Sequence, residues 1–155
     1  MTKLRTLALA LALVLAAALG LTASATAETT PDMRITKVNY NAVGTDTMAN
    51  RNAEVVRIEN KSTDPVDLTD GWKLRDKWGH TYTFADAAVK AVPAGGAVEV
   101  YTGAGTNATA GNVTKLFWNL PFHVWNNSGD WAKLWDSTGG SGADYVSWDA
   151  YLISG

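Results

Sequence analysis

The sequence contains no cysteine, and this absence excludes several kinds of chemistry. A chain without thiols has no disulfides, no thiolate nucleophile and no cysteine ligands for zinc. Its stability must therefore come from a packed core. A chain of 155 residues, of which 46% are hydrophobic and 18% charged, has the composition of one globular domain that can form such a core.

Histidine is also scarce, which leaves little material for acid–base or nucleophilic catalysis. The two histidines are His80, in an expected strand, and His123, in an expected loop. His123 could meet Ser128 and Asp130 as a hydrolytic group, but Ser128 lies in an NSGD turn rather than in a GxSxG turn. The sequence therefore favours a protein that is not an enzyme, with a hydrolase as a distant alternative.

A long apolar run is found only in residues 1–27. This segment has two basic residues near its start, an apolar run at residues 7–21 and small residues that suit cleavage after Ala27 or Ala25. The run is shorter than the roughly 18 residues of a membrane span. The pattern predicts a signal peptide, a secreted protein and no membrane span after cleavage.

Positive charge is limited in the remaining residues, 28–155, which we expect to form the mature domain. Cleavage after Ala27 removes two basic residues and no acidic ones, which leaves 11 basic and 15 acidic side chains and a net charge of −4. Nucleic-acid binding depends on neutralising phosphates. An acidic mature chain therefore predicts no nucleic-acid partner.

Groups of carboxylates in the expected loops could form a calcium site, because calcium binds oxygen ligands. Two groups occur, Asp64, Asp67 and Asp70 in one and Asp46, Asn50, Asn52 and Glu54 in the other. Neither has the spacing of an EF-hand loop. The alternative is that Asp67, Asp70 and Glu54 brace turns by hydrogen bonding to the backbone. We expect no cofactor and no metal site, and the calcium question stays open.

The strongest structural pattern lies in residues 52–76. Residues 53–59 alternate so that Val56 and Ile58 share one face, and residues 60–65 are of types that favour a reversal of the chain. An apolar row then resumes at Val66, Leu68, Trp72 and Leu74, with Gly71 giving the backbone freedom for a bend. We expect Trp72 to be the centre of the core.

Other segments predict short strands separated by Gly and Asx turns, and together they indicate an all-β antiparallel sandwich. A first strand is expected at residues 33–40, although Ile35 and Val38 have opposite phase. A hairpin of residues 72–76 and 80–84 would place Trp78 at its tip. Further strands are expected around residues 98–102, 115–118, 130–136 and 143–148, and residues 102–114 are expected to form a mobile connection.

The same segments resemble a known family. The matching segments read AEVVRIEN and VDLTDGWKLRD, then YTF at 82–84, PAGGAVEVYTGAG at 93–105 and VWNNSGDWAKLWDSTG at 124–139. They are similar to the lamin-tail domain family in its bacterial secreted form, and the similarity covers nearly all of the chain after residue 32. The resemblance implies an immunoglobulin-like β-sandwich. It implies little about role, because bacterial secreted members mostly lack a known activity.

Tryptophan is abundant, with seven residues that all lie after residue 27. The family pattern places Ala132 and Leu134 inward, which would leave Trp131, Lys133 and Trp135 outward. Residues four apart on a strand are about 13 Å apart on one face, at roughly 3.3 Å per residue, so the two indoles could stack on separate sugar rings. In the alternative, these tryptophans pack beneath residues 102–114 and extend the core.

We therefore expect a secreted, non-catalytic binding module. Its predicted ligand is a cell-envelope or environmental polysaccharide, with another extracellular protein as the second class of partner. The predicted ligand-binding residues are Trp131, Lys133, Trp135 and Trp78. The alternative function is a structural or protein-interaction domain outside the cell, which a large flat apolar patch would favour.

Overall fold

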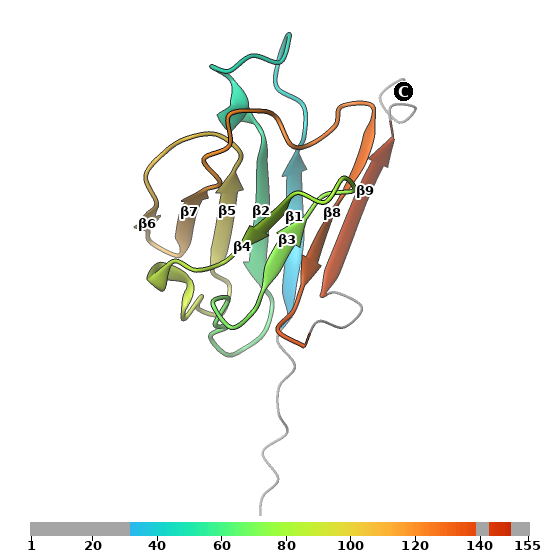
Figure 1. The fold of residues 1–155 in the computed structure, drawn as a ribbon. Coiled ribbons are helices and arrows are strands. Elements are labelled where there is room, and N and C mark those ends of the chain that lie inside the picture. Colours follow the sequence, from blue (N-terminus) through green and yellow to red (C-terminus); the bar gives the residue numbers. More distant parts are fainter. Residues whose placement is uncertain (1–31, 139–142, 150–155) are drawn as a thin grey trace, which may run out of the picture.

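The computed structural model describes residues 32–138 and 143–149, and two β-sheets pack face to face in it (Figure 1). The larger sheet has the strand order β1-β2-β5-β7-β6, and the smaller has the order β4-β3-β8-β9. The strands are β1 (Met33–Asn39), β2 (Val55–Asn60), β3 (Lys73–Arg75), β4 (Thr81–Thr83), β5 (Ala97–Tyr101), β6 (Ala108–Ala110), β7 (Val113–Phe117), β8 (Gly129–Trp135) and β9 (Asp144–Asp149). Two 3-10 turns, η1 (Arg51–Ala53) and η2 (Ala87–Val89), complete the elements of the described residues. The predicted all-β sandwich is confirmed.

The predicted signal peptide lies outside the described residues. Within residues 32–138 and 143–149, no helix has the length and apolar character needed to cross a membrane.

The core lies between the sheets and follows the predicted alternation. Val56 and Ile58 are fully buried, while Arg57 between them faces outward. Trp72 is 2% exposed, as expected for the centre of the core. Trp125, which is distant from Trp72 in the sequence, is also buried, and its ring centre lies 6.1 Å from that of Trp148. Complete burial of a side chain of Val or Leu size contributes about 1.5–3 kcal/mol, so this interior can stabilise a chain without crosslinks.

A β-bulge in β1 explains why its apolar residues have opposite phase. Ile35 pairs with Ile58, but the next aligned pair is Lys37 with Arg57, so one extra residue is inserted in β1. An inserted residue reverses the facing of all residues that follow it. Ile35 is consequently buried, and Val38 also packs against the core.

Contacts between β1 and β9 link two segments that are distant in the sequence. The backbone N–H of Ile35 donates to the carboxylate of Asp144 at 2.6 Å, across 109 residues of sequence. The guanidinium of Arg34 lies 3.9 Å from the same carboxylate. These bonds join the larger sheet to the smaller sheet along one side of the sandwich.

The expectation of a mobile connection over residues 102–114 is wrong. The segment contains β6 and the start of β7, which pair as an antiparallel hairpin with the hydroxyls of Thr109 and Thr114 3.0 Å apart. The sheets are mainly antiparallel, as predicted, and β5 and β7 form one parallel pair within the larger sheet. β6 shows no alternation since all three of its residues are exposed, so its sequence carries no strand signal.

The β3–β4 hairpin forms as predicted. Lys73 pairs with Thr83 and Arg75 with Thr81, and the turn between the strands places Trp78 at the tip with 65% of its surface exposed. Gly71, just before β3, has a φ of +77°, a conformation that residues with a Cβ rarely adopt. This bend brings β3 against β8 in the middle of the smaller sheet.

Candidate binding face

Strand β8 places three of the predicted residues on the outer side of the smaller sheet. Ala132 and Leu134 are fully buried, and the alternating residues Trp131, Lys133 and Trp135 face outward and are half-buried. This is the orientation expected from the sequence. The segment 102–114 does not serve as their cover, because its strand β6 pairs with β7 in the larger sheet.

The neighbouring strands add basic and aromatic side chains to the same face. In β3, Lys73 lies opposite Trp135 and Arg75 lies opposite Lys133. In β9, Tyr145 lies opposite Lys133. We call these side chains the basic–aromatic face: Lys73, Arg75, Trp131, Lys133, Trp135 and Tyr145.

The aromatic rings of this face are paired with neighbours. The ammonium of Lys133 lies 3.9 Å from the centre of the Trp135 ring, within the range of a cation–π interaction. The ring of Trp131 lies 5.9 Å from that of Tyr145, which is 53% exposed. The two tryptophans therefore form two composite surfaces, one with a lysine and one with a tyrosine. Sequence reasoning missed Tyr145 because it could not pair β9 with β8.

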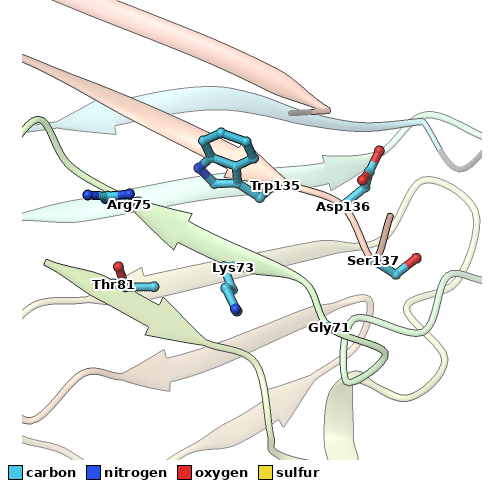
Figure 2. Close-up of a pocket in the computed structure, with 7 residues that line it drawn as sticks. All are labelled: Gly71, Lys73, Arg75, Thr81, Trp135, Asp136 and Ser137. Atoms are coloured by element: carbon cyan, nitrogen blue, oxygen red, sulfur yellow. The ribbon is translucent and has the colours of Figure 1, made fainter. Parts of the chain in front are cut away.

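A groove of about 480 Å³ adjoins Trp135 on this face (Figure 2). Figure 2 shows two cations of β3 beside the indole of Trp135, with Arg75 to its left and Lys73 below it. The residues that line it are Gly71, Lys73, Arg75, Thr81, Trp135, Asp136 and Ser137. The carboxylate of Asp136 accepts hydrogen bonds from the backbone N–H and the hydroxyl of Thr138, at 3.0 and 2.6 Å. The groove is therefore bordered by an indole and two cations, with one carboxylate at its end.

The cations of this face have no carboxylate partner among the described residues. The ion pairs found in residues 32–138 and 143–149 involve Arg34, Arg57, Lys61 and the two histidines, and none involves Lys73, Arg75 or Lys133. Sequence reasoning missed Lys73 and Arg75, although their alternation with Trp72 and Leu74 is a signal that they face outward.

Trp78 lies apart from this groove. It lines a second groove of about 590 Å³, together with His80, His123 and Trp125, and no residue lines both grooves. The hairpin tip is nevertheless tied to β8, because the backbone N–H of Lys77 donates to the carboxylate of Asp130 at 3.0 Å. The structure thus brings three of the four predicted residues together and leaves Trp78 at the hairpin tip.

The two histidines contact buried carboxylates. The Nδ1 atom of His80 lies 2.5 Å from the carboxylate of Asp76, and Nδ1 of His123 lies 3.2 Å from that of Glu54. The other ring nitrogen of His123 lies 3.0 Å from the carbonyl oxygen of Thr47. Both rings are therefore held in fixed positions beside acidic groups.

The hydrolytic group considered from the sequence is not assembled. The hydroxyl of Ser128 donates to the side chain of Asn126 at 2.7 Å, and Asp130 accepts hydrogen bonds from three backbone N–H groups. No hydrogen bond found in the described part of the chain joins His123, Ser128 and Asp130.

The buried carboxylates hold loops in place. Glu54, which is fully buried, accepts hydrogen bonds from the backbone N–H groups of Val124 and Trp125 at 3.0 and 3.2 Å. Burial raises the pKa of Glu54 above its usual value. Asp76 and Asp130 brace turns in the same way. The sequence does contain a signal for these two, because each continues an inward-facing row of its strand.

The bracing role expected for Asp67 and Glu54 is confirmed. Asp67 accepts hydrogen bonds from the backbone and hydroxyl of Thr69, at 2.8 and 2.6 Å. Among the described residues, no group of three or more histidine, aspartate or glutamate side chains is placed so that it could hold a metal ion.

A family model named Lamin Tail Domain matches residues 26–150. The chain belongs to the lamin tail domain family. Lamin tail domains are immunoglobulin-like β-sandwiches without catalytic activity, and they commonly act as structural or protein-interaction modules. No curated protein sequence matches this lamin tail domain.

Proposed function

We propose that this lamin tail domain is a secreted, non-catalytic module that binds a polysaccharide of the cell envelope or the environment. The observation that carries this proposal is that Trp135, whose ring Lys133 contacts, lines a groove of about 480 Å³ on an outward sheet face. A sugar ring presents apolar C–H faces to an aromatic ring and hydroxyls to neighbouring polar groups. Ligand sites commonly combine aromatic walls with a few polar groups in this way.

Secretion is supported by the signal-peptide pattern of residues 1–27. Intact-mass measurement of protein from culture supernatant tests it. We expect the mass of a chain that begins at Thr26 or at Glu28, the first residues after the two cleavage positions. A secreted protein whose mass includes residues 1–20 would contradict cleavage.

The binding proposal is tested with the double variant Trp131→Ala/Trp135→Ala. We expect retention on insoluble polysaccharides and cell-wall material to be lost while the melting temperature changes little, because both side chains face outward. The matched control is Tyr101→Ala/Phe117→Ala, which removes a stacked aromatic pair from the outer side of the larger sheet. Equal retention by the parent and the first variant would contradict the proposal.

A protein partner is the second candidate function, and exposed apolar side chains favour it. Val43, Met48, Trp78 and Phe122 are 99%, 72%, 65% and 45% exposed. The ring of Phe122 lies 5.4 Å from that of His80, which lines the second groove with Trp78. Loss of partner capture in Trp78→Ala/Phe122→Ala, with polysaccharide retention absent in the parent, would favour this function.

A further inference from the structure

We infer that the ligand of the basic–aromatic face is an acidic polysaccharide whose sugar units carry carboxylates, a polyuronate. This inference rests on the proposed polysaccharide-binding function and adds the chemical class of the ligand. The inference rests on the positive charges of the face and on the absence of carboxylate partners for them among the described residues. A neutral glycan would give no reason for unpaired cations at its binding site.

Positive charge is concentrated on this face although the chain as a whole has a net charge of −2. Lys73, Arg75 and Lys133 lie on two adjacent strands, with Arg75 directly opposite Lys133. Side chains at such paired positions start about 5 Å apart, and those two residues apart on a strand start about 7 Å apart. Like charges at these separations repel each other. An anionic ligand would relieve the repulsion.

Elsewhere the chain pairs the central cation of a sheet face with carboxylates of its own. On the outer side of the larger sheet, Arg57 contacts the carboxylates of Glu59 and Glu99 at 2.9 and 2.8 Å. On the basic–aromatic face, the described residues supply no such carboxylates to Lys73, Arg75 or Lys133. The nearest acidic groups in the strand order already have other partners, since Asp136 at the end of the groove accepts from Thr138 and Asp144 in β9 accepts from the backbone of Ile35. Asp149 lies at the far end of β9. The carboxylates that would neutralise these three cations therefore have to come from a bound ligand.

The arrangement suits carboxylates attached to sugar rings. A guanidinium presents a planar fork that binds a carboxylate with two hydrogen bonds, which Arg75 can offer. Trp135 lies opposite Lys73 and beside Lys133, so a sugar ring stacked on the indole would carry its substituents toward both ammonium groups. Asp136 closes the other end of the groove with negative charge, which orients an anionic chain away from that end.

The experiment measures binding of the purified chain to soluble polygalacturonate, to the same polymer with its carboxylates methyl-esterified, and to a neutral glucan. We expect the esterified polymer and the glucan to bind at least about tenfold more weakly, the scale of one lost charged hydrogen bond. Raising the salt from about 0.05 M to about 0.5 M should weaken polygalacturonate binding, because ions screen exposed charges.

The double variant Arg75→Gln/Lys133→Gln should reduce polygalacturonate affinity about tenfold or more at unchanged melting temperature. Glutamine keeps much of the length and hydrogen-bonding capacity of the side chains and removes the charge. The matched control is Lys37→Gln/Lys115→Gln, which removes two exposed lysines from the outer side of the larger sheet and should change affinity less than about twofold.

Three outcomes overturn the inference. Equal binding of the esterified and the acidic polymers would leave the proposed function standing and refute the acidic ligand. Tighter binding of a sulfated polysaccharide or of single-stranded DNA than of polygalacturonate would refute the carboxylate class. Absence of binding to all three polysaccharides would refute the proposed function together with the inference.

Discussion

The outer sides of the two sheets differ in whether their charged side chains form ion pairs. On the larger sheet, Arg57 holds two carboxylates, Lys61 contacts Glu59 at 2.5 Å, and the hydroxyl of Tyr101 donates to Glu99 at 2.9 Å. Hydrogen bonds from Lys61 and Arg57 lower the pKa of Glu59 to about 2. The central arginine of this surface is therefore fully paired, whereas Lys37 and Lys115 at its margins are exposed and take part in no ion pair of the described residues.

The outer side of the smaller sheet carries cations without carboxylate partners among the described residues. The contact that Lys133 does make is with the face of the Trp135 ring. Both surfaces carry aromatic side chains, such as the stacked pair Tyr101 and Phe117 on the larger sheet, so the unpaired cations are what distinguish the face on which we propose a ligand site.

The largest expected effect is on stability, and it shows whether the outer aromatic side chains of the smaller sheet stabilise the fold as the core does. Trp72→Ala should cost about 3–5 kcal/mol of unfolding free energy, because it removes a large buried side chain from the core. Trp135→Ala and Trp78→Ala should each cost far less, about 1 kcal/mol or below for a side chain on the surface. Urea denaturation measures all three. Similar losses for Trp72→Ala and Trp135→Ala would place Trp135 in the core and weaken the comparison.

Removing one arginine from each face should have different effects on stability. Arg57→Ala should destabilise the fold by about 1–2 kcal/mol, because it breaks two half-buried ion pairs and leaves Glu59 and Glu99 close together. Arg75→Ala should change stability by less than about 0.5 kcal/mol, since no ion pair of the described residues includes it. Thermal melts of both variants check this, and equal destabilisation would show that Arg75 is also part of a stabilising network.

Low pH should reduce the stability of the fold, because Glu59 in the larger sheet becomes protonated. Its pKa is about 2 in the folded chain against 4.5 for the free side chain, so the unfolded chain binds more protons between these values. The stabilising contribution is therefore complete above about pH 4.5 and is lost as the pH falls toward about 2. Glu59→Gln should flatten this part of the stability curve, measured by denaturation at a series of pH values. An unchanged slope would mean that Glu59 is not the group responsible.

The smallest expected effect concerns the carboxylate at the end of the groove. Asp136→Asn should tighten polygalacturonate binding about twofold, because it removes a repulsive charge that is screened by water. The amide oxygen of the new side chain can still accept from Thr138, so the turn should keep its shape. Weaker binding after this substitution would place Asp136 among the groups that hold the ligand.

Much of the sandwich is predictable from alternation. Val56, Ile58, Ala132 and Leu134 are buried at the expected positions, and the β3–β4 hairpin places Trp78 at its tip. The bulge in β1 shows in the sequence only as a change of phase between Ile35 and Val38, which does not by itself identify an inserted residue. The parallel pairing of β5 with β7 and the exposed strand β6 were not predictable, because pairings between strands and fully exposed residues leave no periodic trace.

The candidate site was predictable only in part. The outward position of Trp131, Lys133 and Trp135 follows from the inward row of β8, whereas their neighbours depend on which strands flank β8. Arg75 and Tyr145 are far apart in sequence and both lie opposite Lys133 only because β3 and β9 pair with β8 on either side. Register across a sheet therefore decides the composition of the face.

The hydrogen bond between Ile35 and Asp144 can form only late in the synthesis of the chain. The partners are separated by 109 residues, and at about 5–20 residues per second a ribosome needs roughly 5–20 s to travel that distance. Until β9 emerges, the smaller sheet lacks its edge strand and the side chain of Trp148 is missing from the interior. The nascent chain should stay loosely folded throughout this interval, because the sandwich can close only after β9 has been synthesised.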